Sequence, residues 1–115
     1  MTEDTAWRPF EDGSTLGGPG SQGGDITRDE EVPGRLRLTY ESDASRDFHA
    51  VSCLVTGWLL HHRFFDSEEK ALAAFEEMKP ALVELQSQLH PGGPRTSAEG
   101  RAAGPLLARF QVRFS

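Results

Sequence analysis

Cysteine is almost absent from this sequence, with Cys53 the single example in 115 residues. One cysteine cannot form a disulfide within the chain, so nothing indicates an oxidising compartment. Apolar runs long enough to cross a membrane are also missing, as is a basic start followed by an apolar stretch of the kind found in signal peptides. We therefore expect a cytoplasmic protein with no membrane partner.

Basic residues are in deficit, because 12 Lys and Arg stand against 18 Asp and Glu and give a net charge of −6. This surplus of acids opposes general attraction to nucleic acid or anionic lipid, since phosphate binding requires excess Lys and Arg.

The chain length suits one domain. The first 22 residues are rich in Gly and show no hydrophobic period. We expect a flexible N-terminal tail at residues 1–22 and a single domain at residues 23–115.

A first hairpin is predicted around Pro33-Gly34, a pair that suits the central positions of a type II turn. The arm that follows alternates between apolar and polar residues as far as Tyr40. A two-residue loop would set Glu30 opposite Arg37, but it would turn the two acids that flank Glu30 toward the core. A bulge or an irregular first arm would remove that conflict, and the sequence does not choose between them.

A second hairpin is expected from residues 49–65, with Thr56-Gly57 as its two-residue loop. This register sets Cys53 opposite Leu60 and gives one strongly apolar face. The other face is mixed and partly exposed, and it carries Ala50, Ser52, Leu54, Leu59, His61, Arg63 and Phe65. A slip of one residue would exchange the faces, because side chains alternate along a strand.

From Asp66 the hydrophobic period becomes helical, and Asp66 and Glu69 are spaced as a capping box. Apolar side chains then recur at alternating intervals of four and three, at Ala71, Phe75, Met78, Leu82, Leu85 and Leu89. Pro80 lies opposite this stripe, so we expect it to kink the helix or to divide it into two rods. Residues 90–105 are expected to form a flexible connection, and residues 106–114 alternate in the manner of a closing strand.

These elements predict an α+β fold in two layers, with an antiparallel sheet of about four to five strands and one helix packed on one face. The stretches GGDITRDEE, RLRLTYE, GWLLHHRFF and AFEEMK, in that order, resemble a group of small bacterial proteins of unknown function. The resemblance spans residues 23–89, and it implies only that residues 23–31 belong to the domain.

The mixed face of the second hairpin is the first candidate site. It is too apolar to stay bare on a monomer, so we expect it to contact a second copy or another protein. The interface candidates are Leu54, Leu59, His61, Arg63 and Phe65. We interpret the chain as a non-enzymatic binding or assembly domain without a cofactor, which forms a homo-oligomer or binds a protein partner through its open sheet face.

Two alternative sites remain open. Arginines on the outer faces of two strands could bind the phosphates of a nucleic acid, and these are Arg35, Arg37, Arg109 and Arg113. In the register given above, His49, Cys53 and His62 share one face and lie close enough for a shared metal ion or a Cys/His pair. Their spacing matches no compact zinc motif, a buried cysteine reacts poorly, and no catalytic residue can be assigned.

Overall fold

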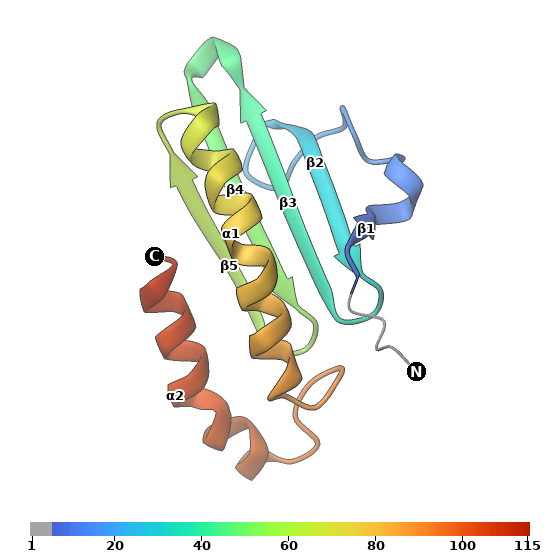
Figure 1. The fold of residues 1–115 in the computed structure, drawn as a ribbon, viewed down its shortest axis with the longest axis vertical. Helices are drawn as coiled ribbons and strands as arrows, with labels where there is room; N and C mark the ends of the chain where they lie inside the picture. Colours follow the sequence, from blue (N-terminus) through green and yellow to red (C-terminus); the bar gives the residue numbers. More distant parts are fainter. Residues whose placement is uncertain (1–5) are drawn as a thin grey trace.

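The computed structural model describes residues 6–115. Its elements are, in order, β1 (Arg8–Pro9), the 3-10 helix η1 (Phe10–Gly13), β2 (Asp25–Val32), β3 (Leu36–Asp43), the 3-10 helix η2 (Ala44–Arg46), β4 (Phe48–Val55), β5 (Leu59–Phe65), α1 (Glu68–Ser87) and α2 (Ser97–Arg113). The strands form one antiparallel sheet in the order β1-β2-β3-β4-β5. In Figure 1, α1 lies across one face of this sheet and α2 lies beside it. The predicted α+β class is confirmed.

The core lies between α1 and the sheet, and the predicted apolar stripe of the helix is confirmed. All six stripe residues are 9% exposed or less, and they pack with helix-facing side chains of β3 and β4 such as Tyr40 and Val51. The cap lies one residue later than predicted, because the Ser67 side chain accepts a hydrogen bond from the Lys70 N–H. The helix is continuous through Pro80, whose side of the helix is exposed.

The closing strand predicted at residues 106–114 is wrong, because this segment belongs to α2. The buried residues of α2 and its C-cap are Ala103, Phe110 and Phe114, and they also recur at helical spacing. The Thr96 side chain accepts a hydrogen bond from the backbone N–H of Glu99, so α2 begins inside the predicted flexible connection. The fold therefore has two helices rather than one.

Both hairpins have three-residue loops instead of the predicted two-residue loops, at residues 33–35 and 56–58. In each loop the central residue is a glycine in the left-handed region, with φ of 73° at Gly34 and 81° at Gly57. The extra residue shifts each register by one position. Because side chains alternate, the shift exchanges the two faces of β5, so the predicted second-hairpin register is wrong.

In the first hairpin the three-residue loop resolves the predicted conflict among the acids, because it moves residues 28–32 one position along β3 and so exchanges the faces of their side chains. Glu30 turns toward the helices, where its carboxylate lies 2.7 Å from Lys79 Nζ. Asp29 turns to the opposite face and meets Arg37. The first arm is also irregular, because the pairing register shifts between Ile26 and Arg28, but this shift lies beyond the acids and does not set their faces.

Residues 1–5 of the predicted tail lie outside the described residues, whereas the rest of that segment contacts the sheet. β1 pairs with β2, and residues 10–24 then cross the face of β2 and β3 that is opposite α1 (Figure 1). The Gly17 N–H donates a hydrogen bond to the Ile26 carbonyl at 2.8 Å, and the Ile26 N–H donates one to the Gly18 carbonyl at 2.8 Å. We call residues 10–24 the strap.

Candidate functional site

The sheet face opposite α1 is divided into a covered half and a bare half. The strap covers β2 and β3, while β4 and β5 carry an uncovered apolar cluster, which we call the open-face patch: Phe48, Leu54, Leu60 and Phe64. Leu60 and Phe64 are 61% and 60% exposed, which is unusual for two large apolar side chains on the same face of one strand. Leu54 pairs with Leu60 across the strands, and the ring of Phe48 lies 6.1 Å from that of Phe64.

A polar pair divides the open-face patch. Ser52 and His62 are directly opposite each other on β4 and β5, and Ser52 Oγ lies 2.7 Å from His62 Nδ1. This distance suits a nucleophile and its base. However, no carboxylate of the described residues orients His62, and the strand backbone around Ser52 is engaged in ladder pairing rather than free to stabilise an oxyanion. The pair therefore serves as a structural hydrogen bond.

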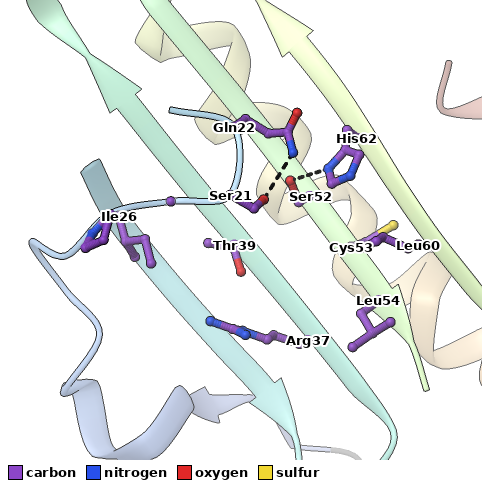
Figure 2. A pocket seen from close by; sticks show the side chains of 12 residues that line it. Ser21, Gln22, Ile26, Arg37, Thr39, Ser52, Cys53, Leu54, Leu60 and His62 are labelled. Atoms are coloured by element: carbon purple, nitrogen blue, oxygen red, sulfur yellow. Dashed lines mark hydrogen bonds between the residues drawn. The ribbon is translucent and has the colours of Figure 1, made fainter. Parts of the chain in front are cut away.

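A cleft of about 570 Å³ lies between the strap and the open-face patch (Figure 2). Strap residues 19–22 form one wall, and Leu54, Leu60 and His62 line the opposite side. Most polar groups of the cleft bind one another: Ser52 contacts His62, and the Gln22 amide donates to Ser21. The cleft therefore presents a mainly apolar surface that continues the open-face patch.

Asp29 is the centre of a buried polar network beneath the strap. Its carboxylate is 2% exposed and accepts hydrogen bonds from Arg37 Nε at 2.9 Å and Nη2 at 2.7 Å, from Thr39 at 3.1 Å and from the strap residue Thr15 at 2.7 Å. The guanidinium of Arg37 also lies 3.8 Å from the ring centre of Phe10. The hydrogen bond to Asp29 raises the pKa of Arg37, so this side chain is held in an internal ion pair.

The four arginines proposed for nucleic-acid binding do not share a face. Arg35 lies in the loop between β2 and β3, and Arg37 is bound by Asp29. Arg109 and Arg113 lie on α2, because the segment predicted as a strand is helical. The predicted arginine-bearing sheet face is therefore not formed.

The proposed metal ligands are also separated. His49 and Cys53 face the helices, where His49 Nδ1 lies 2.8 Å from the Tyr40 hydroxyl, whereas His62 is on the open face. Within residues 6–115, no group of three or more His, Cys, Asp or Glu side chains could hold a metal ion. Burial raises the pKa of Cys53 to about 12, so its thiol stays protonated and unreactive near neutral pH.

The predicted interface residues are distributed over both faces. Leu54 is on the open face, as expected, but the register shift turns the four β5 candidates, Leu59, His61, Arg63 and Phe65, toward the helices. His61 Nε2 lies 2.7 Å from the Phe114 carbonyl oxygen. The Arg63 guanidinium lies 5.0 Å and 5.3 Å from the ring centres of Phe65 and Phe114. His61 and Arg63 therefore help to hold the end of α2 on the sheet.

Leu60 and Phe64 are the exposed residues that the predicted register assigned to the core. The signal for them is the one-residue slip, which exchanges the faces of β5 and brings both side chains onto the open face.

In the described part of the chain, no helix is long and apolar enough to cross a membrane. Comparisons of the chain with protein-family models, with curated proteins and with solved structures found no match.

Proposed function

We propose that the protein is a binding or assembly domain that self-associates through the open-face patch. The exposure of Leu60 and Phe64 at 61% and 60% carries this proposal. A phenylalanine side chain offers roughly 200 Å² to a partner, so Phe64 leaves roughly 120 Å² in water. Burying that area would stabilise a complex by about 3 kcal/mol at about 25 cal/mol per Å².

A second copy suits the open-face patch because the patch is self-complementary about the row formed by Ser52 and His62. Leu60 lies two residues to one side of His62 and Phe64 lies two residues to the other. A half-turn about this row would place Leu60 of one copy on Phe64 of its partner, twice. Such an arrangement is the isologous contact that a two-fold dimer requires.

The patch is small, so the proposed dimer is weak. Leu60 and Phe64 together expose roughly 200 Å² per copy, and burial of both sets would contribute about 10 kcal/mol. Association costs about 4–15 kcal/mol of rigid-body freedom. A cost of about 4–6 kcal/mol, near the lower end of this range, would leave about 4–6 kcal/mol and correspond to dissociation constants from tens of micromolar to about 1 mM.

Sedimentation velocity from about 10 μM to about 1 mM tests this proposal. We expect the average mass of the wild-type protein to rise with concentration. Phe64→Asp should remain monomeric throughout, because dimerisation would desolvate a charge. Val112→Asp is the matched control, since Val112 is 76% exposed but lies on α2, away from the open-face patch.

Three results are decisive. Concentration-dependent association that Phe64→Asp abolishes and Val112→Asp preserves would support the proposal. A wild-type monomer at about 1 mM would refute self-association and leave the patch to a different protein. Association that Phe64→Asp leaves unchanged would place the interface elsewhere. Charged substitutions of Leu59 or Phe65 are unsuitable, because these side chains pack against the core.

A further inference from the structure

We infer that the strap is a displaceable cover, which competes with the second copy for the open face. This inference rests on the proposed self-association. The strap and the open-face patch line the same cleft, so a partner seated on the patch would meet strap residues 19–22 (Figure 2). Displacing the strap would extend the bare surface from β4 and β5 onto β3 and β2.

The first anchor of the strap is the carboxylate of Glu41. This side chain is 1% exposed, and it accepts hydrogen bonds from the backbone N–H of Gln22 at 3.0 and 3.1 Å and from that of Gly24 at 2.7 Å. Among the described residues, no cation pairs with Glu41. Its negative charge is therefore stabilised by strap amides, which form a nest for the anion.

The second anchor is Asp29, whose carboxylate accepts a hydrogen bond from Thr15 at 2.7 Å. Arg37, which Asp29 holds by two hydrogen bonds, supports the Phe10 ring at the start of the strap. Both anchors thus come from acids of the sheet, and both bind the strap through polar groups.

Apolar burial adds little to these anchors. Within residues 10–24 only Gly24 is buried, and Leu16 is 51% exposed. Six of these fifteen residues are glycine, so ordering the strap costs more backbone entropy than ordering an average segment. A segment with few buried apolar contacts opens at a lower free energy than the core beneath it.

Two substitutions would release the strap by different routes. In Glu41→Gln the side-chain NH₂ would face the N–H donors of Gln22 or Gly24, so one acceptor is lost and two donors oppose each other. In Gly20→Ala the charge is kept, but the new Cβ would overlap the Glu41 carboxyl group. Gly104→Ala is a matched control, because its added Cβ would have no atom within 4 Å apart from the adjacent residues and backbone of α2 itself. The other control is Glu77→Gln, which changes an exposed acid of α1.

Amide hydrogen exchange and sedimentation together test the inference on the full chain. In both strap variants we expect exchange at Gln22 and Gly24 to accelerate roughly 10- to 100-fold, while α1 amides keep their protection. We also expect dimers to appear at lower concentration than in the wild type, and Phe64→Asp to remove them in the Glu41→Gln background. The controls should match the wild type.

Unchanged strap exchange in both variants would overturn the inference, because the carboxylate would not be what holds the strap. Faster exchange with wild-type association would also overturn it, because the strap would not compete with the partner. The proposed self-association fails separately, when the wild type and Phe64→Asp sediment alike.

Discussion

The attachment of α2 to the sheet can be tested at Phe114, the last aromatic residue of the chain. Phe114 is 1% exposed, its ring centre lies 4.8 Å from that of Phe110, and its carbonyl oxygen lies 2.7 Å from His61 Nε2. Arg63 and Arg113 lie over the same ring at 5.3 and 4.6 Å. In Phe114→Ala, the backbone contact to His61 can persist but every ring contact is lost.

The cost of Phe114→Ala follows from these contacts. Removing a buried phenylalanine ring costs about 3–5 kcal/mol, and the two cation–π contacts add roughly 0.5–1 kcal/mol each. Besides Phe114, α2 buries only Ala103 and Phe110. This loss of stability is comparable with the free energy by which the buried residues hold α2 on the sheet. We therefore expect α2 to detach as a unit while α1 and the sheet stay folded.

Hydrogen exchange of the α2 amides, combined with urea unfolding, measures this effect. We expect α2 protection to disappear, whereas amides of β3, β4 and α1 keep most of theirs, because Leu38, Val51 and Phe75 are fully buried in the core where α1 contacts β3 and β4. Phe64→Ala is the matched control. Phe64 is 60% exposed, so its loss should cost less than about 1 kcal/mol.

Two outcomes would refute this reasoning. One is an α2 that stays fully protected in Phe114→Ala, which would mean that the ring does not anchor the helix. The other is loss of protection throughout the chain, which would mean that α2 and the sheet fold as one cooperative unit.

Two further predictions concern titratable groups. A thiol reagent at about pH 8 should leave Cys53 unmodified until denaturant unfolds the chain, because burial raises its pKa to about 12; rapid reaction of the folded protein would contradict this. Hydrogen bonds from the Ser45 and Arg46 side chains lower the pKa of Asp43 to about 2, below its ordinary 3.8. Its contribution to stability is therefore present above about pH 4 and lost as the pH falls toward 2, and a carboxyl titration by NMR with a midpoint near 3.8 would contradict it.

Local sequence signals predict the elements that depend on neighbours along the chain. The stripe of α1 is an example, since side chains three and four positions apart must share a helix face whatever the helix packs against. The beginning of α2 had a comparable signal, because Thr96 and Glu99 are spaced as a capping box. The alternating pattern of residues 106–114 nevertheless favoured a strand, because their apolar side chains fit both a period of two and a helical period.

The candidate site is harder to predict because it depends on a single register. In β5 the sequence repeats each type of residue, with Leu59 beside Leu60 and Phe64 beside Phe65, so both faces look equally apolar. A loop of two residues or of three residues then gives equally reasonable cores. The strap poses the same difficulty, because its anchors are buried acids far away in the sequence.

By itself, the sequence determined the α+β class, the buried stripe of α1 and the core face of β4, because periodicity fixes which side chains lie together within an element. Only the tertiary structure decided that Leu60 and Phe64 are exposed, that α2 is a helix and that Glu41 binds the strap. In each case the alternatives are nearly equal in local energy, and contacts between distant segments select one of them.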